Sequence, residues 1–287
     1  IFTDDKTEYD YPDNVKVYYT TLDEIRERFQ SFYDFPIVLD RGWKLCDYKI
    51  AYGEIFEKEL KGYDFWGNCD IDLMWGNIRK FYTDEILEKY DKIGYQAHST
   101  LYKNTPEVNK RYRTVIDGLD NYKMAFSESE GHAFDEVGIE EIYKKLNIPY
   151  YSKVDFAHLA KYETKFYLAT LPKEDYKNDR QVFTWENGKL LRHYLHNGKI
   201  IEEEYMYIHF WCRPMSYKVK NFSDNAKYLI YSDVVTDKPF KLNENLIKRK
   251  GVSHPVAFYA KSIWQNRKKL TLKRIIFNIK GSLNRGN

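Results

Sequence analysis

The stretch YDFWGNCDIDLMWGN, residues 63–77, combines a strand-like run of aromatic and aliphatic residues with two aspartates. Asp70 and Asp72 are two positions apart, and residues i and i+2 of a strand point to the same face. An apolar side chain would pack better at either position. The run therefore predicts a buried strand that carries a pair of adjacent carboxylates, and that pair needs a chemical explanation.

The segments before this stretch alternate between strand and helix patterns. Residues 14–21 alternate enough to form a strand, and residues 22–33 place apolar side chains at helical spacing. Residues 42–62 carry a second helical stripe, which Gly62 closes directly before the quoted strand. This order predicts an α/β fold with a mostly parallel sheet and helices on its faces.

Two Asn-Gly pairs indicate a different kind of sheet later in the chain. Asn187-Gly188 and Asn197-Gly198 stand ten residues apart between β-rich runs, and Asn-Gly favours the type I′ turn of a two-residue hairpin. They predict an antiparallel meander of three strands within residues 181–211. No internal repeat or linker interrupts the chain, so we expect one domain over residues 1–240 and a tail over residues 241–287.

Composition places the chain among globular proteins. Of its 287 residues, 43% are hydrophobic and 17% aromatic, a content that serves strand-rich cores and also surfaces that stack on sugars or bases. The three cysteines form no close pair, which argues against a disulfide framework or a zinc site and fits a reducing cytoplasm. No apolar run approaches the roughly 20 residues of a membrane span. Because the opening IFTDD is typical of a strand that ends in a polar turn, we expect a first strand upstream of it.

Two adjacent carboxylates repel each other unless a positive charge lies between them. At the carboxyl end of a parallel strand they would face the crevice in which α/β proteins bind ligands. A hard divalent cation, Mn²⁺ or Mg²⁺, held by Asp70 and Asp72 would keep open positions for phosphate oxygens. The alternative is a solvated turn, because Asp-x-Asp also occurs by chance in many chains.

Residues 44–81, KLCDYKIAYGEIFEKELKGYDFWGNCDIDLMWGNIRKF, and residues 97–105, AHSTLYKNT, resemble a family of bacterial glycosyltransferase-like proteins found with surface-polysaccharide genes. The similarity spans residues 1 to about 215. More distantly, the order of features resembles glycosyltransferase families 8 and 32. Those families share the GT-A fold, which is Rossmann-like, together with a nucleotide-sugar donor and an Asp-x-Asp metal site. The resemblance thus implies a GT-A-like fold and a UDP-sugar donor.

The segment YIHFWCRPM, residues 207–215, closes the meander. In families 8 and 32 a late His-x-x-Gly-x-x-Lys-Pro-like segment supplies a third metal ligand and a basic residue for the diphosphate. Carried over to this chain, the resemblance implies His209 as the metal ligand and Arg213-Pro214 in place of Lys-Pro. Cys212 stands where the glycine is usual. The alternative for His209 is a histidine that is hydrogen-bonded within the sheet.

Other side chains are candidates for contacts with substrate. Lys44 and Lys49 lie on the predicted helix before the aspartates, where an ammonium could reach the donor phosphates, although solvated helix lysines are common. His98 is a candidate for facing the donor or acceptor sugar. GT-A enzymes contact the nucleoside from the end of the first strand, which here holds three polar residues that an ordinary turn would explain equally well: Thr3, Asp4 and Asp5.

A transferase that inverts the anomeric centre needs a carboxylate base to deprotonate the acceptor hydroxyl. Asp135 and Glu136, in the segment SEGHAFDEVG, are the candidates. The alternative is structural, because acidic residues are also favoured in the first turn of a helix by its macrodipole. A retaining reaction would require no such base.

The tail is basic. From Lys241 onward the chain has twelve Lys and Arg residues and one acidic residue, Glu244. Within SIWQNRKKLTLKRIIFNIKGSL, residues 262–283, apolar and basic residues interleave as in a helix that lies on an anionic membrane surface. We therefore expect the protein in the cytoplasm, on the inner face of the plasma membrane. A nucleic-acid partner is not expected because no binding motif is present, and a helix packed on the body is the structural alternative.

Together with the paired aspartates, the resemblance implies a metal-dependent glycosyltransferase that moves a sugar from a UDP-sugar to a bacterial capsular or other surface polysaccharide, with a glycan or lipid-linked glycan as acceptor. A non-catalytic glycan-binding or scaffold protein is the first alternative. A phosphatase of the haloacid dehalogenase type is disfavoured, because Met74 stands where that motif continues with Thr or Val.

Overall fold

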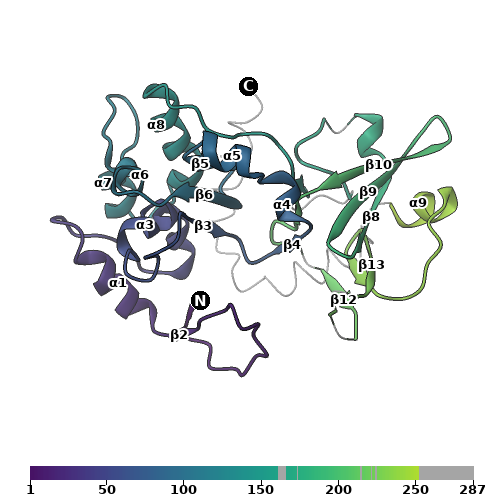
Figure 1. Cartoon of the computed structure of the whole chain (residues 1–287), viewed down its shortest axis with the longest axis horizontal. Helices are drawn as coiled ribbons and strands as arrows, with labels where there is room; N and C mark the ends of the chain where they lie inside the picture. Colours follow the sequence, from purple (N-terminus) through teal and green to yellow (C-terminus); the bar gives the residue numbers. More distant parts are fainter. Residues whose placement is uncertain (161–165, 173, 214, 221, 224, 252–287) are drawn as a thin grey trace, which may run out of the picture. The chain divides into compact units, whose positions relative to one another are not determined.

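The computed structural model describes residues 1–160, 166–172, 174–213, 215–220, 222–223 and 225–251. Contacts within the chain divide it into two compact units, and Figure 1 labels many of their helices and strands. Unit 1 contains residues 1–71 and 82–154, and unit 2 contains residues 72–81 and the described chain from Asp155 onward. This division differs from the single domain over residues 1–240 that the sequence predicts. The first crossing between the units falls between Ile71 and Asp72.

The quoted stretch forms two short strands instead of one buried strand. β3 (Phe65–Cys69) belongs to unit 1 and β4 (Leu73–Trp75) belongs to unit 2. Within β3 only Trp66 is buried, and Ile71, which separates the two aspartates, is fully exposed. The two aspartates thus interrupt the apolar run at the point where the chain leaves one sheet for another.

Unit 1 contains most of the described helical elements, which are short and pack around an aromatic core. α1 (Leu22–Gln30) starts with a capping box between Thr21 and Glu24, an arrangement that contributes about 1 kcal/mol to helix stability. The helix predicted over residues 42–62 is broken into short turns, and from it Tyr48 stacks on Phe126 with ring centroids 4.1 Å apart. These turns are η1 (Gly42–Lys44), α2 (Leu45–Tyr48), η2 (Lys49–Ala51) and α3 (Tyr52–Ile55).

Two small sheets complete unit 1. β3 pairs antiparallel with β6 (Ser99–Lys103), which pairs antiparallel with β5 (Lys92–Ile93). β1 (Phe2–Thr3) and β2 (Tyr18–Tyr19) form a separate parallel pair. The other helical elements are α5 (Asp84–Lys89), α6 (Pro106–Lys110), η3 (Arg111–Arg113), α7 (Tyr122–Ser127), the π-helical turn η4 (Phe134–Gly138) and α8 (Ile139–Lys145).

Unit 2 contains a larger and a smaller sheet. The larger sheet has the strand order β10-β9-β8-β13-β14-β12. In the smaller sheet β11 (Tyr207–His209) lies between β4, to which it is antiparallel, and β7 (Ala157–His158), to which it is parallel. The larger sheet comprises β8 (Gln181–Glu186), β9 (Lys189–His196), β10 (Lys199–Tyr205), β12 (Ser216–Lys218), β13 (Lys227–Tyr231) and β14 (Val234–Thr236), and the short helices are α4 (Ile78–Phe81), η5 (Tyr176–Asn178) and α9 (Glu244–Lys250).

The predicted meander is confirmed. β8, β9 and β10 are consecutive antiparallel strands, joined at Asn187-Gly188 and Asn197-Gly198. All four turn residues have positive φ, between +50° and +77°, as a type I′ turn requires. The local turn chemistry therefore fixed the register of these hairpins.

The prediction of a mixed α/β protein is confirmed, but a mostly parallel sheet is not seen among the described strands. Their parallel pairs are β1 with β2, β7 with β11, and β12 with β14, whereas the others, including the pair of β3 with β6, are antiparallel. A parallel pair between consecutive strands needs a crossover of a dozen or more residues. The meander turns and the loop 94–98 between β5 and β6 are too short for such a crossover.

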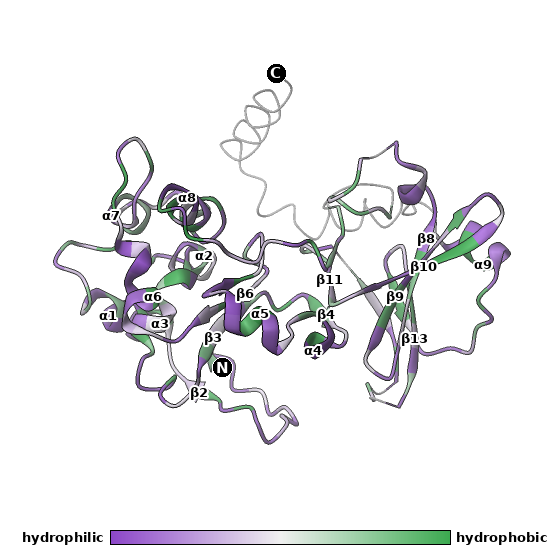
Figure 2. Cartoon of the chain, turned by 45° about the horizontal axis from the view of Figure 1, so that its top comes forward, coloured by the Kyte–Doolittle hydropathy of each residue, from purple (hydrophilic) through white to green (hydrophobic). Residues whose placement is uncertain are grey.

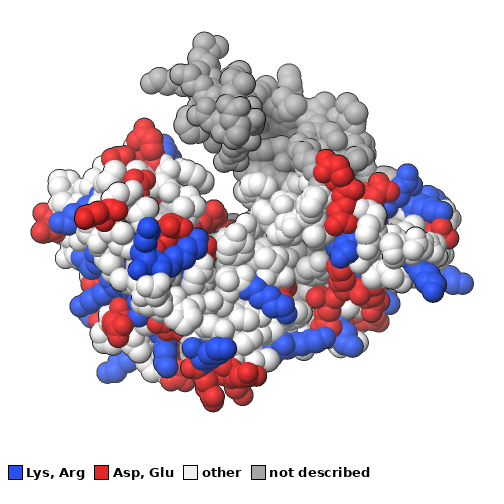
Figure 3. All heavy atoms as spheres, turned by 90° about the horizontal axis from the view of Figure 1, so that it is seen from above, with Lys and Arg blue, Asp and Glu red and all other residues white. Residues whose placement is uncertain are grey.

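Apolar and charged residues are interspersed along the described chain. None of its described helices is both long and apolar enough to cross a membrane, and hydrophobic and hydrophilic residues alternate along the ribbons in Figure 2. On the face shown in Figure 3, Lys and Arg lie among Asp and Glu. α9 lies at the start of the predicted basic tail, whose residues 252–287 lie outside the described part of the chain.

Candidate functional site

Asp70 lies directly after β3, in a cluster of charged side chains of unit 1. Its backbone N–H donates to the carbonyl oxygen of His98 at 2.8 Å, which continues the pairing of β3 with β6. Its carboxylate accepts a hydrogen bond from the Lys49 ammonium, with an Nζ–Oδ1 distance of 2.7 Å. The same ammonium lies 3.3 Å from Oδ2 of Asp135. The structure thus brings together three of the predicted site residues: Lys49, Asp70 and Asp135.

Asp135 is the titratable group of this cluster whose charge changes near neutral pH. It lies in η4, only 6% of its surface is exposed, and burial raises its pKa to about 7 even though the Lys49 ammonium acts in the opposite direction. Burial lowers the pKa of Lys49, but the charges of Asp135 and Asp70 outweigh burial and raise it above its usual value. A carboxyl group with a pKa near the working pH is suited to general base catalysis.

Asp72 and His209 form a second cluster, which lies entirely within unit 2. β11 runs antiparallel to β4, so that His209 pairs with Leu73, and the Phe210 N–H donates to the carbonyl oxygen of Asp72 at 3.0 Å. These backbone contacts place Nε2 of His209 at 3.3 Å from Oδ1 of Asp72. The other carboxylate oxygen of Asp72 accepts the Cys212 N–H at 2.5 Å. Burial acts to raise the pKa of Asp72, but the hydrogen bonds from His209 and Cys212 outweigh burial and lower it to about 2.

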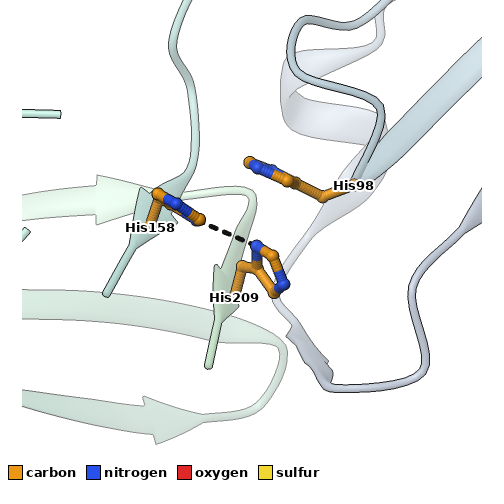
Figure 4. Close-up of side chains that lie close together, drawn as sticks. All are labelled: His98, His158 and His209. Atoms are coloured by element: carbon orange, nitrogen blue, oxygen red, sulfur yellow. Dashed lines mark hydrogen bonds between the residues drawn. The ribbon is translucent and has the colours of Figure 1, made fainter. Parts of the chain in front are cut away.

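His158 is a member of this cluster that the sequence analysis missed. It lies on β7 beside His209, and the two Nδ1 atoms are 2.9 Å apart, as the dashed line in Figure 4 shows. The Trp211 ring covers His158 with centroids 4.5 Å apart. Burial, reinforced by the neighbouring His209, lowers the pKa of His158 to about 4, so its imidazole is neutral at pH 7. The only sequence signal is a histidine within the short apolar segment VDFAHLA, residues 154–160.

The donor atoms of Asp72 and His209 fit a divalent cation. Two neighbouring ligands of an octahedral site with bonds of 2.0–2.1 Å lie about 3 Å apart, close to the 3.3 Å between Nε2 and Oδ1. The low pKa of Asp72 keeps its carboxylate ionised, as a ligand must be. Asp70 is separated from Asp72 only by Ile71, so covalent geometry alone limits the distance between their Cα atoms to about 7 Å. The donor atoms of Asp72 and His209, two of the three predicted ligands, are chemically consistent with Mn²⁺ or Mg²⁺.

The predictions for two basic residues need correction. Lys44 is fully buried, and its ammonium donates to the Asp47 carboxylate at 2.9 Å and to the carbonyl oxygens of Ala125 at 2.7 Å and Glu130 at 2.5 Å. It therefore holds the fold of unit 1 and does not reach a phosphate. Arg213 is also buried and donates to the carbonyl oxygens of Ser232 and Ala160, both at 3.1 Å, so its guanidinium anchors the chain after β11. Pro214 lies outside the described residues.

The other candidates also lie in unit 1. His98 is buried at the end of the loop 94–98, where Gln96 and Ala97 have positive φ, and it is also drawn in Figure 4. Glu136 is exposed. Of the residues predicted to contact the nucleoside, Thr3 ends β1 and is half-buried, whereas Asp4 and Asp5 follow it and are exposed. The Thr3 hydroxyl accepts the Asp5 N–H, and the Asp5 carboxylate accepts the Thr7 N–H and the Tyr9 hydroxyl.

Comparison with known proteins places the chain in a family without assigning an activity. The chain belongs to a family of unknown function, DUF6625, whose model matches residues 1–239. No curated protein and no solved structure matches it. The functional argument therefore rests on the residues and on their geometry within each unit.

Proposed function

We propose that this protein is a metal-dependent glycosyltransferase of GT-A type that uses a nucleotide-diphosphate sugar, with a UDP-sugar as the favoured donor. The observation that carries the proposal is the pairing of Asp72 with His209. The two residues are far apart in sequence, yet strand pairing within unit 2 places a carboxylate oxygen 3.3 Å from an imidazole nitrogen. That pairing supports the metal site implied by the resemblance to families 8 and 32.

In this proposal Asp70, Asp72 and His209 would hold Mn²⁺ or Mg²⁺, and the ion would supply positive charge for the departing diphosphate. Asp72 is suited to its part because one carboxylate oxygen accepts the Cys212 N–H, while the other lies beside Nε2 of His209. Lys49 keeps the Asp70 carboxylate in place and supplies a second positive charge beside it. A phosphate oxygen that entered near Asp70 would meet that ammonium as a point charge.

Asp135 is the proposed general base if the reaction inverts the anomeric centre. Its pKa of about 7 allows it to accept a proton from an acceptor hydroxyl and later release it. Lys49 stabilises the ionised form, because its ammonium lies 3.3 Å from Oδ2 of Asp135. Glu136 is exposed and lacks the burial that raises the pKa of its neighbour, which makes Asp135 the stronger candidate.

The proposal also includes a glycan acceptor and a contact with the membrane. We propose a surface-polysaccharide or lipid-linked glycan acceptor, presented at the inner face of the plasma membrane. The apolar and basic residues predicted to contact an anionic membrane lie within 252–287, outside the described part of the chain. Vesicle binding by the full chain, with and without anionic lipid, would test this contact separately from catalysis.

Calorimetric titration of UDP and GDP, with and without Mn²⁺, tests the donor site. We expect one nucleotide to bind only with the cation, and the double variant Asp70→Ala/Asp72→Ala to abolish that binding. The matched control is Asp13→Ala/Asp117→Ala, which removes the same charge from two exposed positions and should bind like the wild type. If the folded wild type binds neither nucleotide at millimolar concentration, the transferase proposal is wrong and a glycan-binding or scaffold role takes its place.

A further inference from the structure

A second histidine, His158, contacts the candidate cation ligand His209 through the ring nitrogen that faces away from Asp72. His209 directs Nε2 towards Asp72 and Nδ1 towards His158. All three residues belong to unit 2, and both imidazoles are buried. This inference rests on the proposed function, because it concerns how the chain prepares His209 for a cation.

A hydrogen bond between two Nδ1 atoms requires one proton, so one ring donates and the other accepts. A histidine that binds a cation through Nε2 uses the lone pair of that nitrogen, and its remaining proton is then at Nδ1. We propose that His158 is a positioning residue that accepts the Nδ1–H of His209 and thereby keeps Nε2 of His209 as the ligand atom facing Asp72. Histidine ligands in metalloproteins are commonly held in this way by a partner on the second ring nitrogen.

The backbone around the pair fixes both rings. β7 and β11 are parallel with His158 in register with His209, and the Leu159 N–H donates to the carbonyl oxygen of His209 at 3.0 Å. The carbonyl oxygen of His158 accepts the Ala169 N–H at 2.7 Å, and the Trp211 ring lies against the His158 ring. Turning either imidazole away would leave buried ring nitrogens without their hydrogen bond, which is unfavourable.

The role requires a lone pair at Nδ1 of His158, which an imidazole with its single proton at Nε2 provides. A carboxylate in the same position would add a further negative charge to a site that already holds Asp72. The arrangement therefore orients the ligand without changing the charge of the site. The imidazole ligand itself favours cations that bind nitrogen, such as Mn²⁺ or Zn²⁺, over Mg²⁺.

Substitutions at His158 test the role through cation affinity. In His158→Leu the acceptor is lost, and we expect Mn²⁺ affinity measured by calorimetry to fall roughly 10–100-fold. In His158→Asn the amide oxygen can stand near the position of Nδ1, so affinity should recover towards that of the wild type. The matched control is His193→Leu, which removes another buried histidine of unit 2, bonded to Thr184 in the larger sheet, and should leave Mn²⁺ affinity unchanged.

The wild-type protein provides a test that needs no substitution at His158. With Zn²⁺ as a diamagnetic cation, ¹⁵N NMR of the histidine rings should show His209 protonated at Nδ1, its signals being assigned by their absence in His209→Asn. A ring protonated at Nε2 in the loaded protein, or a folded His158→Leu that binds Mn²⁺ within twofold of the wild type, would overturn the inference and leave the proposed function intact. A wild type that binds neither Mn²⁺ nor Zn²⁺ would remove the cation site, and both proposals with it.

Discussion

Asp135→Asn should stabilise the protein, and the gain should grow with pH. Burial holds the pKa of Asp135 at about 7, above its ordinary value of 3.8. Each pKa step of one corresponds to about 1.4 kcal/mol, so this rise amounts to about 4 kcal/mol. Below pH 3.8 both the folded and the unfolded states hold the proton. Between pH 3.8 and about 7 the folded state binds more protons, so the free energy of unfolding of the wild type falls as the pH rises.

Asparagine resembles the protonated carboxyl group and does not ionise. The free energy of unfolding of the variant therefore does not fall in this pH range. We expect equal stability near pH 4 and a difference that approaches about 4 kcal/mol in favour of the variant at pH 8. Urea denaturation from pH 4 to pH 8.5 would measure the difference. Hydrogen exchange of peptides within residues 122–145 would assign it to unit 1.

Glu136→Gln is the matched control, because it removes an exposed carboxylate from the next position of the same turn. It should show no comparable change with pH. If the stability of Asp135→Asn relative to the wild type is independent of pH, or decreases as the pH rises, then Asp135 is ionised throughout and its ion pair with Lys49 is net stabilising. The same variant should lose transferase activity if Asp135 is the base.

Three further predictions follow from side chains in both units. Lys44→Met should lower the free energy of unfolding by about 3–5 kcal/mol, because it leaves the buried Asp47 without its cation, and exposed Lys58→Met should change it little in the same urea titration. Gly188→Ala should lower the free energy of unfolding by about 1 kcal/mol because of its φ of +77°, since a Cβ there meets nothing within 4 Å. Gly42→Ala, where a Cβ also meets nothing but φ is not positive, should leave thermal unfolding nearly unchanged. Mn²⁺ should bind more tightly than Mg²⁺, and in competitive titrations His209→Asn should reduce the ratio of the two affinities. An equal reduction in His193→Leu would contradict the assignment of His209 as a ligand.

The features that the sequence predicted well are local ones. The Asn-Gly turns contain in two residues the conformation that sets the meander, and the apolar spacing that predicts α1 lies within residues 22–33. The direction of β3 could not be predicted in this way, because it depends on β6, a partner about thirty residues away. The alternation of strands and helices favoured a parallel sheet, and nothing local opposed that interpretation.

The candidate site likewise combines features that local sequence reveals with features that depend on distant segments. The spacing of Asp70 and Asp72 is visible in the sequence, and the resemblance to known families pointed to His209. The ion pairs of Lys49 and the support from His158 depend on packing between segments that are distant in the chain. Lys44 and Lys49 look alike in the sequence, but only a structure shows that one is sealed in the core while the other lies between two carboxylates.

The pairing of β4 with β11 determines when the Asp72–His209 cluster can exist during protein synthesis. Hairpins joined by two-residue turns form in roughly 1–10 μs, so the meander can assemble as soon as its strands are available. Asp72 leaves the ribosome long before His209, by roughly 7–27 s at 5–20 residues per second. A nascent chain therefore carries the carboxylate without its imidazole until translation has passed β11. Capture of a cation by this cluster would then mark the completion of unit 2's smaller sheet.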